Sequence, residues 1–111
     1  MKREIKFRAW DKKLNKMYDF ADISDYPLSR LNNSVVFDFM QFTGLKDKNG
    51  KEIYEGDIMS INNLVLGKII FENGCFQIFD INSTQGTNPL NKDRIKKLSS
   101  VGNIYENPEL L

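Results

Sequence analysis

The sequence predicts a single, mainly β domain, and three observations lead to that prediction. The chain has 111 residues, of which 41% are hydrophobic and 28% charged, values typical of one globular domain with its own core. Apolar and polar residues alternate with a period of two, and no segment keeps a 3.6-residue period for more than two turns. Asn-Gly pairs at residues 49–50 and 73–74 are hairpin signals between such segments.

The N-terminal residues predict a β-hairpin. Residues 2–9 alternate apolar and charged side chains, which places Phe7 on the face that we assign to the core. A polar turn over residues 11–16 then leads into a second strand over residues 17–20.

The next segment predicts a loop followed by a third strand. Between residues 21 and 34 the alternation is lost, and Pro27 is suited to the start of one helical turn. β-branched and aromatic residues are dense between residues 35 and 42, which favours a strand that carries Phe39 into the core.

Charges predict the register of the hairpin that contains Asn49 and Gly50. A two-residue turn would place Lys48 opposite Lys51, and like charges directly opposite each other are destabilising. A three-residue loop closed by Gly50 with a positive φ places Asp47 opposite Lys51 instead. We therefore predict the second register, with a bulged loop.

Three further strands follow in a meander. Residues 58–61 and 64–71 predict strands joined by a turn at residues 62–63. Pairing across a two-residue turn at residues 73–74 places apolar residues opposite one another on one face, which we assign to the core. The predicted pairs are Phe71 with Phe76 and Ile69 with Ile78. The predicted core as a whole is Phe7, Phe39, Ile58, Ile69, Phe71, Phe76, Ile78 and Ile104.

The C-terminal part predicts short elements. Residues 82–91 are loop-like, and either Asn88 or Asn91 is suited to cap a short helix. Residues 101–105 predict a last strand, and Asn107-Pro108 is a plausible cap and first position for one closing turn.

The residue types argue against catalysis. The chain has no histidine and one cysteine, which excludes the usual zinc sets and any Ser-His or Cys-His nucleophile, and Cys75 has no basic neighbour in sequence to activate it. Glu52, Glu55 and Asp57 are candidate acids or bases, but hydrogen bonds to nearby backbone amides explain Asp57 without catalysis. No nucleotide-binding glycine pattern occurs. We predict no enzyme activity and no cofactor.

A metal site is equally unsupported by the sequence. Asp19, Asp22 and Asp25 could hold a hard cation, but they lack the glycine and the twelve-residue frame of an EF-hand loop. A solvated acidic loop explains them better, and we predict no metal.

Positive charge is concentrated near the N-terminus. Residues 1–16 hold seven Lys or Arg against two acids, and residues 92–97 hold four against one. Lys6, Arg8 and Trp10 share strand parity, an arrangement suited to single-stranded nucleic acid. The alternative is a tryptophan that covers the end of a barrel while lysines solubilise the outside. The candidate nucleic-acid-binding residues are Lys6, Arg8, Trp10, Lys12 and Lys13.

Three blocks of sequence stand out: REIKFRAWDKKLNKMY, FTGLKDKNGKEIYEGDI and VGNIYENPELL. Together they resemble the YopX family of phage and prophage proteins. The resemblance implies one domain over the whole chain, with an SH3-like barrel of residues 43–81 and 99–105 extended by an N-terminal hairpin of residues 1–20. Residues 22–36 and 82–94 match no block, so the resemblance implies nothing about a partner surface there.

These observations favour a phage- or prophage-encoded, non-catalytic binding module in the cytoplasm of a bacterial host. Its partner is then nucleic acid or a phage or host protein. The alternative is a self-associating structural or adaptor protein, favoured by strand edges and by the outward-facing Ile70 and Phe79. No apolar run approaches the about 20 residues that cross a bilayer, and the N-terminus lacks a signal sequence, so we expect no membrane segment.

Overall fold

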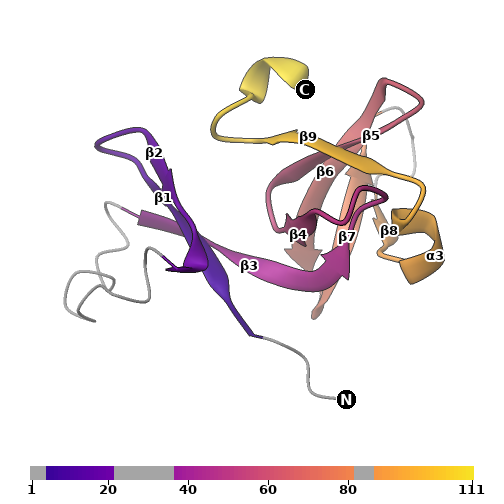
Figure 1. The fold of residues 1–111 in the computed structure, drawn as a ribbon, viewed down its shortest axis with the longest axis horizontal. Coiled ribbons are helices and arrows are strands. Elements are labelled where there is room, and N and C mark those ends of the chain that lie inside the picture. Colours follow the sequence, from indigo (N-terminus) through magenta and orange to yellow (C-terminus); the bar gives the residue numbers. More distant parts are fainter. Residues whose placement is uncertain (1–4, 22–36, 82–86) are drawn as a thin grey trace. The chain divides into compact units, whose positions relative to one another are not determined.

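A computed structural model describes residues 5–21, 37–81 and 87–111 and confirms a mainly β protein (Figure 1). The described strands form two sheets, with the orders β2-β1-β3-β4 and β8-β7-β6-β5-β9, and the five-stranded sheet is curled into a half-barrel. The strands are β1 (Phe7–Asp11), β2 (Lys16–Tyr18), β3 (Phe37–Lys46), β4 (Glu52–Tyr54), β5 (Asp57–Ile61), β6 (Leu64–Glu72), β7 (Cys75–Asp80), β8 (Thr87–Pro89) and β9 (Ser99–Asn103). The short helices are α3 (Lys92–Ile95) and η1 (Pro108–Leu110).

The chain divides into an N-terminal unit, residues 1–42, and a C-terminal unit, residues 43–111. In the N-terminal unit, β1 is the central strand and pairs antiparallel with β2 and with the first half of β3. The helical turn predicted at Pro27 lies outside the described residues.

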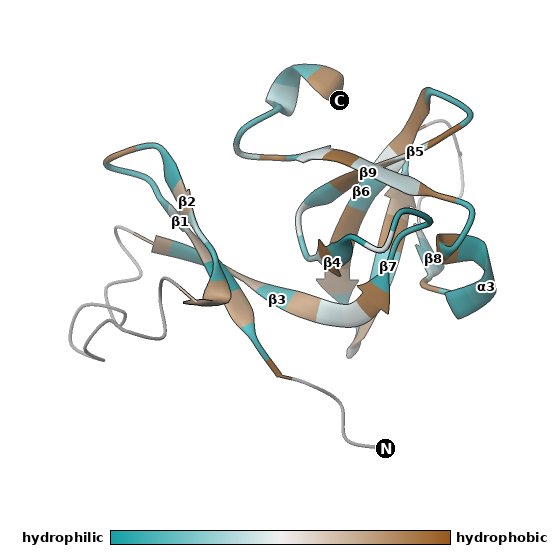
Figure 2. Ribbon diagram, in the orientation of Figure 1, coloured by the Kyte–Doolittle hydropathy of each residue, from teal (hydrophilic) through white to brown (hydrophobic). Residues whose placement is uncertain are grey.

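The face of the N-terminal sheet that we assigned to the core is the wrong one. Phe7 and Phe39 are 38% and 39% exposed. Trp10, Met40 and Phe42 are buried instead, and the β1–β3 register places Trp10 and Met40 on the other face from Phe7 and Phe39. Hydrophobic and hydrophilic segments follow one another along β3 in Figure 2, but Phe39 and Met40 are adjacent hydrophobic residues on opposite faces. Alternation identifies two faces, but the larger set of buried side chains decides which face is interior.

In the C-terminal unit the predicted hairpin registers are correct. Phe71 pairs with Phe76 and Ile69 with Ile78 across the two-residue turn, and both turn residues have a positive φ. In the other hairpin, Gly50 has a φ of +81°, and the Asp47 amide donates to the Lys51 carbonyl at 2.8 Å, which is the three-residue loop.

The core of this unit is only partly the predicted one. Buried side chains form one cluster of Ile53, Met59, Ile69, Ile78, Ile95 and Leu98, and Ile58 is also buried. The prediction of Phe71 as a core residue was wrong, because it lies next to the turn, beyond the Ile69–Ile78 pair, and is 47% exposed. Phe76, whose ring lies 4.9 Å from that of Phe71, and Ile104 are half-buried rather than buried.

Local irregularities curl the five-stranded sheet. Register shifts interrupt β5 on both sides, between Met59 and Ser60 against β6 and between Ile58 and Met59 against β9. Such bulges increase twist and bend a strand. Gly67 also allows the backbones of β6 and β7 to approach each other closely, since a Cβ at this position would overlap with the main-chain oxygen of Phe79 in β7.

The C-terminal elements agree with the sequence in part. Asn91 caps α3, and its side chain accepts a hydrogen bond from the Asp93 amide at 2.8 Å. It is one of the two residues that were predicted as caps. The loop predicted over residues 82–91 contains β8, and the last strand begins and ends two residues earlier than expected. η1 begins at Pro108, but the side chain of Asn107 does not cap it. No helix in the described residues is long and apolar enough to cross a membrane.

Candidate nucleic-acid interface

The β1–β2 hairpin of the N-terminal unit is shaped by its turn. Asp11 is buried, and its carboxylate accepts hydrogen bonds from the amides of Lys13 and Leu14 at 2.9 and 3.0 Å. Asn15 adopts a positive φ of 52° and closes the turn. This turn projects the exposed Lys12 and Lys13, and the Lys12 ammonium lies 3.4 Å from the carboxylate of Asp38.

Three of the predicted site residues lie along the buried face of this sheet. Trp10 is 9% exposed, so its indole offers no free face on which a base could stack. Lys6 and Arg8 are half-buried, and the Lys6 ammonium lies 4.8 Å from the centre of the Phe42 ring. These cations border buried aromatic side chains instead of flanking an exposed one.

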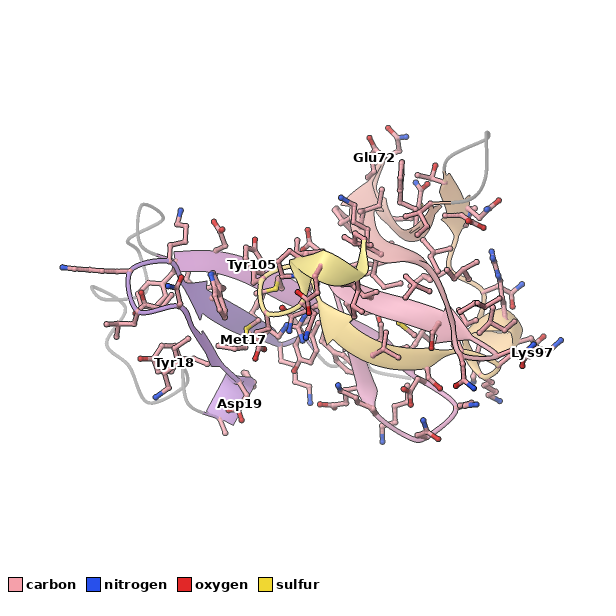
Figure 3. All side chains as sticks on the ribbon, turned by 90° about the horizontal axis from the view of Figure 1, so that it is seen from above. Met17, Tyr18, Asp19, Glu72, Lys97 and Tyr105 are labelled. Atoms are coloured by element: carbon pink, nitrogen blue, oxygen red, sulfur yellow. The ribbon has the colours of Figure 1, made fainter. Side chains whose placement is uncertain are left out.

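The opposite face of the same sheet carries exposed rings. We call it the aromatic face and define it by Phe7 from β1, Tyr18 from β2, and Phe37 and Phe39 from β3. The registers place them together: Ala9 of the central strand is opposite both Tyr18 and Phe39. Met17 and Tyr18 lie on opposite sides of β2 (Figure 3).

The rings of the aromatic face form a row. The centroids of Tyr18 and Phe37 are 6.3 Å apart with the planes at 70°, and those of Phe37 and Phe39 are 6.2 Å apart. Ala9 is buried between the longer side chains and does not project beyond them, because its side chain is a single methyl group. Phe7 and Phe39 are the most exposed rings of the row.

Positive charge borders the aromatic face. Lys16 is opposite Asp11, and its ammonium lies 4.9 Å from the centre of the Tyr18 ring. Lys13 is exposed in the adjoining turn. Asp11 also belongs to this face, but its carboxylate is buried and is hydrogen-bonded to the turn amides.

Asp47 holds together two distant segments of the C-terminal unit. Burial of its carboxylate alone would raise the pKa, but hydrogen bonds from the amides of Ser100, Lys51 and Asn49, together with the charge of Lys51, outweigh that effect and lower the pKa below its ordinary value. The three distances are 2.9, 2.9 and 2.8 Å. The residue therefore ties the β3–β4 turn to β9.

The other buried polar groups of this unit also serve the backbone. Asp57 accepts from the Tyr54 amide at 2.8 Å, the use expected from its place after Gly56. Asn103 accepts from the amides of Tyr105 and Glu106 at 3.0 and 2.9 Å and shapes the C-terminal turn. The described ranges contain no cluster of His, Cys, Asp or Glu suited to a metal ion.

Cys75 lies at the surface beside the β6–β7 turn. Its thiol is free and exposed, and its sulfur lies 3.7 Å from the carbonyl oxygen of Glu72. In the sequence Cys75 has no basic neighbour to activate it, and the contact with Glu72 is within its own hairpin.

Sequence reasoning found the basic residues but missed the rings of the aromatic face. It placed Phe7 in the core because this residue alternates with charged residues, and Phe39 because β-branched and aromatic residues are dense in its strand. The sequence offered no signal that separates the two faces. Across the paired strands, apolar residues are about evenly divided: one face carries Phe7, Ala9, Tyr18, Phe37 and Phe39, and the other carries Trp10, Met17, Met40 and Phe42. Which face is buried therefore depends on what packs against it.

Comparisons with known proteins agree with the fold. The family model described as YopX protein matches residues 6–111. Among solved structures, the crystal structure of protein EF1440 from Enterococcus faecalis is similar to this chain, with a TM-score of 0.72 and 26% sequence identity over 99% of each chain. No curated protein matches.

Proposed function

The chain belongs to the YopX family, and from this premise we propose that it is a phage- or prophage-encoded, non-catalytic module that binds nucleic acid. The observation that carries the proposal is the aromatic face of the N-terminal unit, with exposed rings bordered by lysines. Aromatic rings combined with cations are the chemistry by which proteins bind nucleic acids without a catalytic group.

Charge supports the choice of a polyanionic partner. The described residues of the N-terminal unit, 5–21 and 37–42, contain five Lys or Arg and three Asp. One of the three, Asp11, is buried at the turn, and another, Asp38, is paired with Lys12. In the sequence, residues 1–42 as a whole contain eight Lys or Arg against six Asp or Glu.

The non-catalytic part of the proposal is supported by how the buried carboxylates are used. The buried carboxylates of the described residues are Asp11, Asp47 and Asp57, and each accepts from a backbone amide of its own turn. These hydrogen bonds explain the three carboxylates without catalysis. Asp47 and Asp57 lie in the central block that resembles the family.

We further propose that the half-barrel is an SH3-like barrel and that the protein acts in the bacterial cytoplasm. Closure is supported at the β3–β4 turn, where the Lys48 amide donates to the Leu98 carbonyl at 3.0 Å and Asp47 accepts from the Ser100 amide. NMR contacts between the second half of β3 and β9 would establish a closed barrel.

Titration of labelled oligonucleotides tests the function. Fluorescence anisotropy with DNA and RNA probes of about 20 nucleotides, at about 50 and 200 mM salt, should show an affinity that falls as the salt concentration rises. Lys13→Ala and Lys16→Ala should each reduce the log–log salt slope by roughly 0.7 for a single strand. Lys48→Ala, at an exposed turn of the C-terminal unit, is the matched control and should leave the slope unchanged. No binding of any probe at 50 mM salt would refute the function.

Self-association is a second candidate function, favoured by exposed apolar residues on the β6–β7 hairpin. Phe71 lies beside the turn and Phe79 faces outward at 39% exposure, with Lys68 over its ring at 5.8 Å. Such residues are suited to pairing between copies of the chain. Light scattering at tens of micromolar tests this candidate, and a concentration-independent monomer would exclude it.

A further inference from the structure

We infer that the aromatic face binds unpaired bases, with Phe7 and Phe39 as the two stacking platforms. This inference rests on the proposed function and specifies its ligand as single-stranded nucleic acid. The two rings come from neighbouring strands, and each is exposed by more than a third of its surface, 38% and 39%. A base needs an accessible ring face, which the buried Trp10 lacks.

The spacing of the two platforms favours a strand whose bases are separated. Phe7 is opposite Gln41, and Phe39 lies two residues along β3 on the same face, so the two are diagonal neighbours. Diagonal neighbours in an antiparallel pair lie roughly 7–8 Å apart. Successive nucleotides in a duplex strand rise only about 3.4 Å, so two bases on both rings must be unstacked from each other. Only an unpaired strand can do this without melting a duplex.

The chemistry of the face also argues against reading of a duplex. Duplex sequences are recognised by donors and acceptors that reach base edges in a groove. Phe7, Phe37 and Phe39 have no donor or acceptor in their side chains, and Tyr18 carries the single hydroxyl of the row. Rings of this kind contact the faces of bases, which are accessible only in single strands.

The cations lie where phosphates of such a strand could be neutralised. Lys16 stands at the Tyr18 end of the row, with its ammonium 4.9 Å from the ring centre, and Lys13 is exposed in the adjacent turn. A strand whose bases cover Phe39 and Phe7 would have its backbone reach the positive end of the row. An acidic protein segment would satisfy the same lysines but would gain nothing from flat ring faces.

The test compares single strands with duplexes in ring variants. The probes are a labelled 20-residue oligo-dT, a labelled 20-residue oligo-U and a labelled 20-base-pair DNA duplex. Phe7→Ala and Phe39→Ala should each weaken single-strand binding about 5- to 150-fold, the equivalent of one lost base stack. Phe79→Ala is the matched control, because that ring is equally exposed, at 39%, but lies in the C-terminal unit. Circular dichroism and denaturant melts on each variant establish that the fold is retained.

Each outcome separates this inference from the broader function. Tighter binding of the single strands than of the duplex, lost in the two ring variants and kept in Phe79→Ala, supports the inference. Equal binding of the duplex, or ring variants that bind like the control, would overturn it while the nucleic-acid function stands. Failure of every nucleic-acid probe would remove both. Ring-dependent binding of poly-glutamate in place of the oligonucleotides would assign the face to an acidic protein and also overturn the inference.

Discussion

The two units of this chain differ in how much of their structure is determined locally. In the C-terminal unit, both predicted hairpin registers are present, because turn residues with positive φ and opposite charges across the strands select them. In the N-terminal unit, strands were predicted at about the right places, but the wrong face was assigned to the core, and Phe7 and Phe39 are exposed. Register is encoded within a few residues, whereas the choice of buried face depends on what packs against it.

The largest expected effect tests whether the Trp10 face is interior. Trp10→Ala should reduce the free energy of unfolding by about 3–5 kcal/mol, because a large buried ring is removed and a cavity is left. Phe39→Ala, on the exposed face, is the control and should cost about 1 kcal/mol. Urea melts measure both. Equal losses in the two variants would mean that the faces of the N-terminal sheet are not distinct in solution.

The next effect separates the two cross-strand pairs of the β6–β7 hairpin. Ile78→Ala should cost about 2–5 kcal/mol, since this residue is buried in the core cluster. Phe71→Ala should cost only about 1 kcal/mol, because nearly half of its surface, 47%, is already in contact with water. Thermal and denaturant melts on both variants check the order. A loss for Phe71→Ala as large as that for Ile78→Ala would restore the sequence-based assignment of Phe71 to the core.

A smaller effect comes from the buried carboxylate of Asp47. In Asp47→Asn the side chain keeps one acceptor oxygen for three amide donors, so we expect a loss of about 1–3 kcal/mol at neutral pH. The pKa of Asp47 is lowered in the folded state, so its contribution is fully present above the unfolded-state value of about 3.9. That contribution is lost as the pH falls through the lower folded-state pKa.

The pH dependence provides the measurement. Denaturant melts of parent and Asp47→Asn between pH 7 and pH 2 should show the difference in stability narrowing below about pH 4. Glu72→Gln, at an exposed side chain of the same unit, is the control variant and is melted in parallel. A difference that stays constant to pH 2, or that grows, would contradict the role of the ionised Asp47 carboxylate.

Contacts between residues that are close along the chain could be predicted from the sequence, whereas contacts between distant residues could not. The bond from the Tyr54 amide to Asp57 and the cap of α3 by Asn91 span two or three residues and were predicted from their local patterns. The bond from the Ser100 amide to Asp47 spans 53 residues, and no local pattern announces it. The start of β9 at Ser99, two residues before the predicted start, was missed for the same reason, because the limits of this strand depend on its pairing with the distant β5.

The candidate site divides in the same way. Its basic residues are visible in the sequence because charge is a property of composition, and Lys13 is exposed in the turn. Its rings were missed, because exposure of Phe7 and Phe39 depends on which face the paired strands bury. Trp10 shows the converse, since an aromatic residue between cations was weighed as a platform and is buried.

The smallest expected effect tests whether the β3–β4 turn requires a residue with a positive φ at position 50. Gly50 has a φ of +81°, and a Cβ built there meets no atom within 4 Å, so Gly50→Ala adds backbone strain without a steric clash. The expected cost is about 1–2 kcal/mol, the penalty of an L-residue in the left-handed region. Gly50→Asn should cost less, because asparagine tolerates this region and Asn73 already adopts a φ of 55° in this chain.

The comparison with Gly67 gives this last prediction its control. At Gly67 a Cβ would overlap with the main-chain oxygen of Phe79, so Gly67→Ala should cost more than Gly50→Ala, and Gly67→Asn should be no better. Melts of the four variants distinguish strain in φ from close packing of strands. Suppose instead that Gly67→Asn were more stable than Gly67→Ala, while Gly50→Asn were no more stable than Gly50→Ala. A positive φ would then not be what requires glycine at position 50, and the three-residue loop would not be what fixes the register of the β3–β4 hairpin.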